Sequence, residues 1–148
     1  MSILRLDDFV PYRLSYTSNL VSEAIARTYE SLFGLSIPEW RLIAVIAEHE
    51  GLTQAAICTR TGMDKVTVSR AAIALSTRSL IARARSTTDR RSHDLALTGE
   101  GRALYAQVAP KALELEKRIF GGLGAEELRA FVATLRRIDG IVGSGANQ

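Results

Sequence analysis

The sequence predicts a mainly helical protein with one small β-hairpin, a fold of the α+β class. Three observations lead to this prediction. Apolar residues recur every three or four positions over most of the chain. Two short segments with helix-capping residues meet at a glycine between residues 53 and 70. Two stretches of alternating residue type then follow between residues 80 and 97.

The N-terminal part is expected to form two helices. From Asp8 to about Phe33 the apolar residues fall at helical spacing, and Pro11 is tolerated because it stands in the first turn. Ser36 and Glu39 have the spacing of a capping box. The second helix should therefore begin after Ser36 and end near His49.

The next segment has the pattern of a helix-turn-helix. Thr53 can cap a short helix by accepting a hydrogen bond from an unpaired backbone N–H group. Gly62 then tolerates the positive φ of a tight turn, and Asp64 offers a second N-cap. Two short helices joined by a three-residue turn are the simplest interpretation.

The second of these helices should bury one side and expose another. Val68, Ala72 and Leu75 recur at spacings of four and three, so they are expected to face the core. The polar residues near its outer, N-terminal end carry donors that suit base edges and phosphates in a major groove. A solvated helix face with two cations is the alternative interpretation. The candidate DNA contacts of both helices are Thr53, Gln54, Lys65, Thr67, Ser69 and Arg70.

A hairpin with a polar tip should follow. Residues 80–85 and 93–97 alternate like half-exposed strands, and residues 86–92 between them contain no hydrophobic side chain. A guanidinium on such a tip can enter a minor groove, where the negative potential is enhanced. Asp89 can hold a neighbouring arginine in place by an ion pair.

Charge is concentrated in the same region. Between Arg60 and Arg91 there are eight cationic and two anionic side chains, whereas the rest of the chain has eleven and fourteen. A basic block on a mildly acidic chain indicates a surface that binds a polyanion, because each neutralised phosphate releases counterions. An acidic protein partner would also explain the charge, although it would not explain the helix-turn-helix.

Three motifs together resemble those of the multiple antibiotic resistance regulator (MarR) family of bacterial transcription factors. They are MDKVTVSR at 63–70, DRR at 89–91 and LALTGEG at 95–101. The resemblance covers about residues 11–138. It implies a winged helix-turn-helix in each subunit of an obligate homodimer, and a small-molecule or oxidant signal that changes DNA affinity. By the same resemblance Asp89 and Arg91 form the wing-tip pair, and Arg90 is the alternative groove-inserting residue.

The chain departs from the family pattern at two places. Ile73 and Ala74 stand where polar or charged residues are usual, so the far end of the recognition helix should make fewer DNA contacts. Ser79 stands where a glycine commonly ends that helix. If the backbone at Ser79 is left-handed, the serine costs on the order of 1 kcal/mol.

The C-terminal part should form two further helices. One begins after Thr98, bends near Pro110 and reaches Phe120, and the other follows the break at residues 121–124. We expect residues 8–35 and 99–142 to dimerise, 36–98 to form the winged region, and 143–148 to form a disordered tail of a single domain, residues 1–148. Two copies would cover apolar faces that one subunit leaves open, and their twofold symmetry predicts a pseudo-palindromic operator in double-stranded DNA.

Composition excludes several other classes of function. No apolar run approaches the length of about 20 residues that a membrane span needs, and no signal peptide is apparent, so a cytoplasmic protein without membrane contact is expected. One cysteine and two widely spaced histidines do not suit a zinc site. Neither a P-loop nor a nucleophile elbow occurs. We therefore expect no catalysis, no metal and no cofactor.

An effector site is expected near the start of the first helix. Several polar and aromatic side chains gather there at helical spacing, and an arginine among them could bind a carboxylate. Packing of these aromatic rings within the core is the alternative. The candidate ligand residues are Tyr12, Arg13, Ser15, Tyr16, Asn19 and Trp40.

Three functional hypotheses follow from these patterns. The first is a sequence-specific repressor released by a small aromatic or phenolic ligand. The second is a nonspecific nucleoid-type DNA-binding protein, or a winged module that binds proteins. The third is a redox-responsive regulator that uses Cys58. We expect Cys58 to be a packing residue instead, because reactive thiols need exposure and a lowered pKa.

Overall fold

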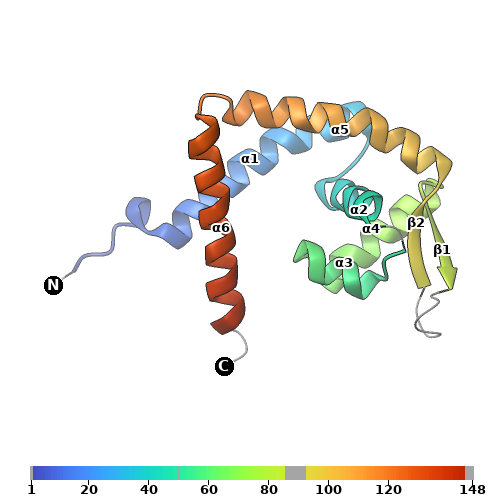
Figure 1. Ribbon diagram of the computed structural model, residues 1–148, viewed down its shortest axis with the longest axis horizontal. Helices are drawn as coiled ribbons and strands as arrows, with labels where there is room; N and C mark the ends of the chain where they lie inside the picture. Colours follow the sequence, from blue (N-terminus) through green and yellow to red (C-terminus); the bar gives the residue numbers. More distant parts are fainter. Residues whose placement is uncertain (1, 50, 86–92, 146–148) are drawn as a thin grey trace. The chain divides into compact units, whose positions relative to one another are not determined.

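The computed structural model describes residues 2–49, 51–85 and 93–145, which form the helices and the hairpin of Figure 1. The chain divides into two compact units, Met1–Lys111 and Ala112–Gln148. The first unit contains the helix-turn-helix and both strands. The predicted α+β class is confirmed, because a mostly helical chain carries one small antiparallel sheet.

A short 3-10 helix, η1 (Leu6–Asp8), and two helices, α1 (Val10–Phe33) and α2 (Ile37–Glu48), begin the first unit. Helix α1 ends at Gly34, whose φ of 64° is left-handed. The predicted capping box is confirmed, since the Ser36 hydroxyl accepts from Glu39 N at 3.3 Å and Ser36 N donates to Glu39 Oε1 at 3.0 Å.

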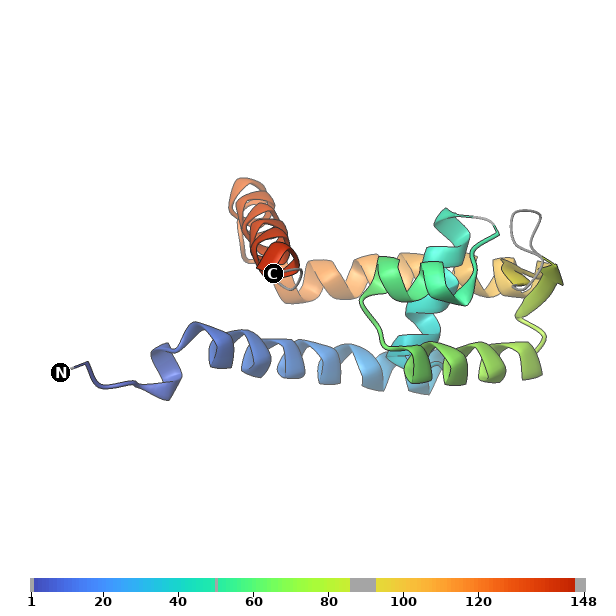
Figure 2. The same cartoon turned by 90° about the horizontal axis from the view of Figure 1, so that it is seen from below.

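The helix-turn-helix consists of α3 (Gln54–Thr61) and α4 (Lys65–Thr77). Both predicted caps are present: Thr53 Oγ1 accepts from Ala56 N at 3.1 Å, and Asp64 Oδ1 accepts from Thr67 N at 2.8 Å. Gly62 has a φ of 71°, as the turn requires. Figure 2 shows α3 and α4 at one end of the first unit, and both also contact the hairpin.

The hairpin pairs β1 (Ile81–Arg85) with β2 (His93–Leu97) in antiparallel register, from Ile81 opposite Leu97 to Arg85 opposite His93. Leu52, just before α3, adds an isolated bridge to Leu95, and Leu95 N donates to Leu52 O at 2.7 Å. The sequence pattern did not predict this bridge. It ties the helix-turn-helix to the base of the wing.

The core of the first unit lies where α2, α3, α4 and β2 meet. Each of these elements contributes side chains that solvent does not reach, and their burial stabilises the unit by removing apolar area from water. The predicted inward stripe of α4 is confirmed, because its three members are fully buried. Fully buried core residues include Leu42, Ile43, Ile57, Val68, Ala72, Leu75 and Val108.

The turn after α4 is held by the residues that start the next helix. Ser79 has a φ of 59°, so its backbone is left-handed. This is the conformation in which a serine in place of glycine is expected to cost stability. Thr98 Oγ1 donates to Ser79 O at 2.7 Å and accepts from Gly101 N at 3.0 Å, and Thr98 N donates to Leu80 O at 3.1 Å. Thr98 therefore caps the next helix, which begins directly after it as predicted, and also anchors the turn.

Two long helices complete the chain. Helix α5 (Gly99–Phe120) continues through Pro110, and α6 (Ala125–Gly145) follows the predicted break at residues 121–124. Helix α6 extends through Gly145, so residues 143–145 are helical although the sequence suggests that the tail begins at Gly143. Among the residues that the structure describes, no helix is long and apolar enough to cross a membrane.

Candidate nucleic-acid interface

Helix α4 presents a mixed polar and apolar surface to solvent. Lys65 and Arg70 are exposed, whereas Thr67 and Ser69 are half-buried. Val66 and Ile73 are each 58% exposed. The sequence pattern did not identify Val66 as a candidate contact, although its place outside the buried stripe would have revealed it. A helix with this surface offers donors for base edges and methyl groups for thymine.

Thr67 has a second role at the start of α4. Its hydroxyl donates to Asp64 Oδ2 at 2.8 Å while its backbone N–H donates to Asp64 Oδ1. The hydroxyl proton is therefore engaged within the cap, and Thr67 can meet DNA only as an acceptor or through its methyl group. The backbone N–H of Thr67, with the hydroxyl next, lowers the pKa of the Asp64 carboxyl.

The two remaining helix-turn-helix candidates lie at the start of α3. Thr53 and Gln54 are both half-buried. Because the Thr53 oxygen accepts the capping hydrogen bond, its O–H group remains available as a donor. This end of α3 can therefore offer a backbone and hydroxyl contact to a phosphate, as helix N-termini do.

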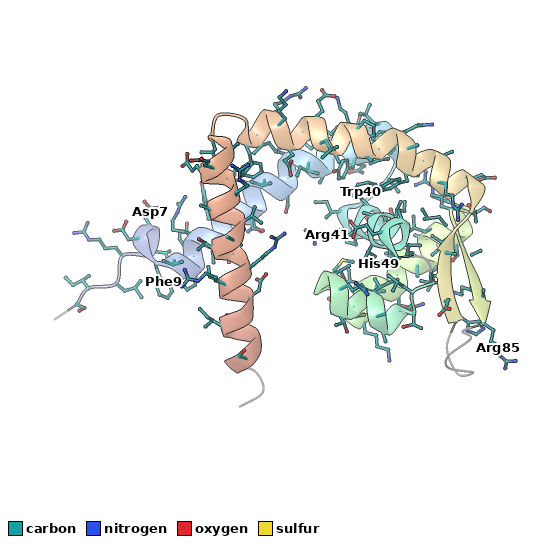
Figure 3. All side chains as sticks on the ribbon, viewed as in Figure 1. Asp7, Phe9, Trp40, Arg41, His49 and Arg85 are labelled. Carbon is teal, nitrogen blue, oxygen red and sulfur yellow. The ribbon has the colours of Figure 1, made fainter. Side chains whose placement is uncertain are left out.

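The arginines of the basic block do not all face solvent in the same way. Arg83 and Arg85 are exposed on β1, and Figure 3 shows Arg85 projecting from the end of its strand. Arg60 Nη1 lies 3.1 Å from His49 Nε2. Arg78 instead donates to main-chain carbonyls, which the sequence pattern did not anticipate. All four arginines are exposed, but Arg60 and Arg78 use part of their hydrogen-bonding capacity within the chain.

The predicted wing-tip residues Asp89, Arg90 and Arg91 lie outside the described residues. The strands that support the tip are described, and their last pair is Arg85 opposite His93. Seven residues separate these strand ends. The predicted pair of Asp89 and Arg91 belongs to these seven residues.

Three of the candidate ligand residues of α1 contact one another, and of these Arg13 and Tyr16 are exposed while Tyr12 is half-buried. The ring centroids of Tyr12 and Tyr16 are 5.9 Å apart, and the Arg13 guanidinium lies 5.3 Å above the Tyr16 ring. Arg13 Nη1 also donates to Asp7 Oδ1 at 3.1 Å, so a carboxylate of the chain itself already occupies this arginine. Ser15 and Asn19 on the same helix are exposed.

Trp40 belongs to a different aromatic group. Its ring lies 5.8 Å from that of Tyr29 and stacks on that of Tyr105, also at 5.8 Å (Figure 3 shows Trp40 on α2). Burial raises the pKa of the Tyr29 hydroxyl. The structure therefore joins Trp40 to Tyr29 and Tyr105, which were not among the predicted ligand residues.

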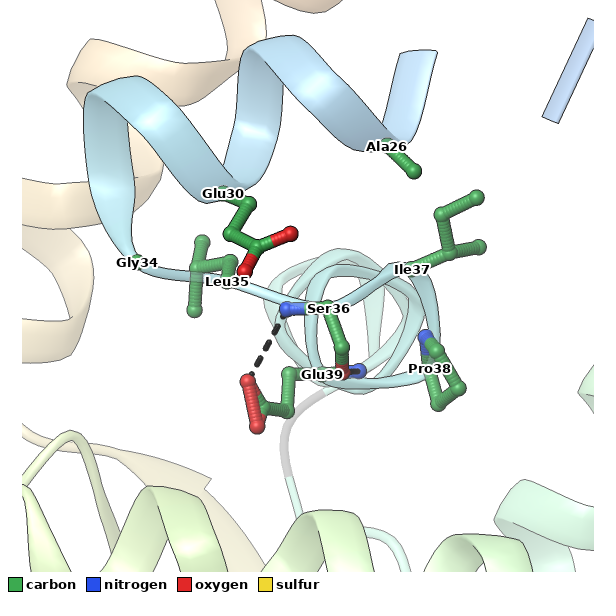
Figure 4. A pocket seen from close by; sticks show the side chains of 8 residues that line it. All are labelled: Ala26, Glu30, Gly34, Leu35, Ser36, Ile37, Pro38 and Glu39. Carbon is green, nitrogen blue, oxygen red and sulfur yellow. Dashed lines mark hydrogen bonds between the residues drawn. The ribbon is translucent and has the colours of Figure 1, made fainter. Parts of the chain in front are cut away.

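A pocket opens at the joint between α1 and α2 (Figure 4). Its volume is about 520 Å³, and it lies beside the capping box. None of the predicted ligand residues lines it. The lining residues are Ala26, Glu30, Gly34, Leu35, Ser36, Ile37, Pro38 and Glu39.

Cys58 and the acidic and imidazole side chains offer little chemistry of their own. Cys58 is a half-buried free thiol on α3. No three of the His, Cys, Asp and Glu side chains in the described ranges are grouped so that they could hold a metal ion. The α4 surface is therefore the most developed candidate site of the chain.

Comparison with known sequences agrees with this arrangement. The sequence model of the MarR family matches residues 33–92, which include the helix-turn-helix and the first strand of the hairpin. The transcriptional regulator HosA of Escherichia coli O157:H7 is 27% identical over 119 residues, which cover 80% of this chain and 88% of HosA.

Solved structures extend the similarity over nearly the whole chain. A MarR/EmrR family transcriptional regulator from Acinetobacter sp. ADP1 has a TM-score of 0.88 at 23% identity, covering 95% of this chain and 99% of that one. Bordetella bronchiseptica BpsR has a TM-score of 0.85 at 23% identity, covering 93% and 98%. Both share the fold. Its winged helix-turn-helix, its match to the family model over residues 33–92 and its regulator relatives make this chain similar to the MarR family of DNA-binding transcriptional regulators.

Proposed function

We propose that the protein is a sequence-specific repressor that reads its operator with α4 in the major groove. The observation that carries this proposal is the division of α4 into two sides. Val68, Ala72 and Leu75 are fully buried, while Lys65 and Arg70 are exposed. A rigid helix fixed by apolar packing and bearing cations on its free side is what major-groove recognition requires.

The contacts divide by chemistry. The Arg70 guanidinium can donate two hydrogen bonds to guanine O6 and N7, and Lys65 can neutralise a phosphate or donate to a guanine. The exposed methyl groups of Val66 and Ile73 suit thymine. Ser69 and Thr67 supply hydroxyl oxygens. At the wing, Arg91 or Arg90 would enter the minor groove with Asp89 as the partner of Arg91.

A homodimer is part of this proposal. Large apolar side chains are exposed on the N-terminal part of α1 and on α6, including Leu14, Leu20 and Phe131. A second copy would remove such surface from water. Twofold symmetry would then place two copies of α4 about 34 Å apart, one turn of duplex, on a pseudo-palindromic site. Since such a regulator acts on DNA, its place of action would be the cytoplasm.

The release of DNA by a small aromatic ligand is supported by the two aromatic groups and by one relative. The solved BpsR structure concerns regulation of DNA binding by 6-hydroxynicotinic acid. In the present chain, Tyr12, Arg13 and Tyr16 offer rings beside a cation, and Trp40 offers a stacked pair with Tyr105. A planar carboxylate that displaced Asp7 from Arg13 would fit the first group.

Measurement of DNA affinity tests the central part of the proposal. Duplex selected from a random library by the wild-type protein would be titrated with wild type, Lys65→Ala and Arg70→Ala by fluorescence anisotropy. A bidentate Arg70 contact predicts a loss of about 1–3 kcal/mol in binding free energy. Arg118→Ala is the control, because it removes one cation of α5 that forms an exposed ion pair with Glu114. Equal affinity of wild type and Arg70→Ala would contradict the proposal.

Two other functions remain separable by experiment. A nucleoid-type protein would select no sequence from the library and would bind all duplexes with the same affinity. A redox-responsive regulator would lose DNA affinity on treatment with peroxide, and Cys58→Ser would abolish that response. Cys58 is half-buried on α3, and this does not favour the nucleoid-type or the redox-responsive function over release by an aromatic ligand. The proposed function includes no catalytic step.

A further inference from the structure

We infer that Arg78 is a positioning residue for DNA reading, because its guanidinium ties the C-terminal end of α4 to the C-terminal end of α1. This inference rests on the proposed role of α4 as the recognition helix. Arg78 Nη1 donates to Gly34 O at 3.0 Å, and Nη2 donates to Phe33 O at 3.1 Å. The bonded residues are 44 and 45 positions apart in the sequence. A two-donor fork on successive carbonyls fixes direction as well as distance.

The electrostatics of the α1 terminus explain why a cation is held there. The last carbonyls of a helix lack intrahelical partners and carry partial negative charge. The last turn of α1 contains no basic residue, and the last turn of α4 contains none either. Arg78 therefore supplies from another element the charge and the donors that the end of α1 lacks. Arg78 remains exposed to solvent, so these two hydrogen bonds compete with any phosphate for its guanidinium.

The backbone at Arg78 transmits the restraint to the recognition helix. Arg78 N donates to Ala74 O at 3.2 Å, so the residue is the direct continuation of α4. The next residue, Ser79, is held by Thr98 through the 2.7 Å hydrogen bond to its carbonyl. Two independent attachments, one to α1 and one to the start of α5, therefore fix the end of α4. Apolar packing of Leu75 and Val68 fixes its depth.

Restraint at the C-terminal end of α4 also affects its N-terminal end, because a rigid helix that shifts at one end changes its tilt. Thirteen residues at a rise of about 1.5 Å each span about 20 Å, so a 1 Å shift at the Arg78 end tilts the axis by about 3°. Base contacts need hydrogen-bond geometry, whereas phosphate contacts depend mainly on charge. Loss of the restraint should therefore weaken specific binding and leave nonspecific binding unchanged.

The test compares Arg78→Ala and Arg78→Lys with wild type on the selected duplex and on a scrambled duplex, over a series of salt concentrations. Arg78→Ala should lower affinity for the selected duplex about tenfold. On the scrambled duplex, its affinity and its dependence on salt should equal those of wild type. Arg78→Lys keeps the charge but has one donor nitrogen in place of the two-nitrogen fork, so it should recover part of the specific affinity.

Two outcomes would overturn the inference. Specific affinity equal to that of wild type in Arg78→Ala would show that the tie does not position α4. A fall of about 0.9 in the salt slope on scrambled DNA would show that Arg78 contacts a phosphate directly. If Arg78→Ala fails to fold, as judged by circular dichroism, Arg78→Lys carries the same comparison. Arg70→Ala, measured alongside, separates this inference from the proposed function. If Arg70→Ala loses affinity for the selected duplex and Arg78→Ala does not, only the positioning role is refuted.

Discussion

Substitution of Gly101 by alanine should destabilise the protein strongly, although both residues are compatible with a helix. Gly101 lies buried in the first turn of α5, and a Cβ atom there would stand 2.0 Å from Leu80 O and 3.1 Å from Leu80 C. The obstructing atoms are backbone, so no side-chain rotation can relieve the clash. The same backbone accepts the Thr98 N–H that joins α5 to the turn after α4.

The magnitude follows from three contributions. Forcing backbone apart in a packed interior costs about 3 kcal/mol, at the upper part of the usual range for added methyl groups. Loss of the two Thr98 hydrogen bonds to Leu80 O and Ser79 O adds about 1 kcal/mol each. The better helix propensity of alanine offsets about 1 kcal/mol. The free energy of unfolding should fall by about 4 kcal/mol.

Gly99→Ala is the matched control, because Gly99 opens the same helix and a Cβ atom there meets nothing within 4 Å. It should be neutral or stabilise by up to about 1 kcal/mol. The assay is urea unfolding followed by circular dichroism, at one protomer concentration because the proposed dimerisation would contribute to stability. Equal unfolding midpoints for the two variants would refute the argument for close approach at Gly101.

Two further predictions concern α4. Leu75→Ala should lower the free energy of unfolding by about 2–5 kcal/mol in the same urea assay, because Leu75 is fully buried, whereas Ile73→Ala at an exposed position of the same helix should change it little. The lowered pKa of Asp64 implies that its carboxylate stabilises the fold above about pH 4 and that this contribution is lost as pH falls through the lowered pKa. Asp64→Asn should therefore reduce the melting temperature at pH 7 and differ less from wild type at pH 3; an unchanged difference would contradict this.

The elements that the sequence predicted well are those fixed by local interactions. The caps at Ser36, Thr53 and Asp64 each join residues three positions apart, and the buried stripe of α4 follows from helical periodicity. Such features depend on neighbours in the chain. The ends of α1, α2 and the strands could therefore be placed within a few residues.

The features that the sequence did not predict depend on contacts between distant segments. By charge alone Arg78 belongs to the basic block, but in the structure it donates hydrogen bonds to the end of α1. Trp40 was grouped with α1 aromatics, but its ring partner Tyr105 lies 65 positions along the chain on α5. The Leu52 bridge to Leu95 is equally remote. No periodicity or spacing encodes these pairs, because only the packed fold brings them together.

The account depends most directly on whether the exposed side of α4 lies against DNA bases. In a Cys58→Ala background, a photoactivated cross-linker on Val66→Cys would be irradiated with the selected duplex, and the modified bases mapped on both strands. The same probe on Ser18→Cys, an exposed position of α1, is the control. The account predicts adducts at bases of the selected site from position 66 and none from position 18. A labelled protein that binds the duplex but gives no base adduct from position 66 would contradict it.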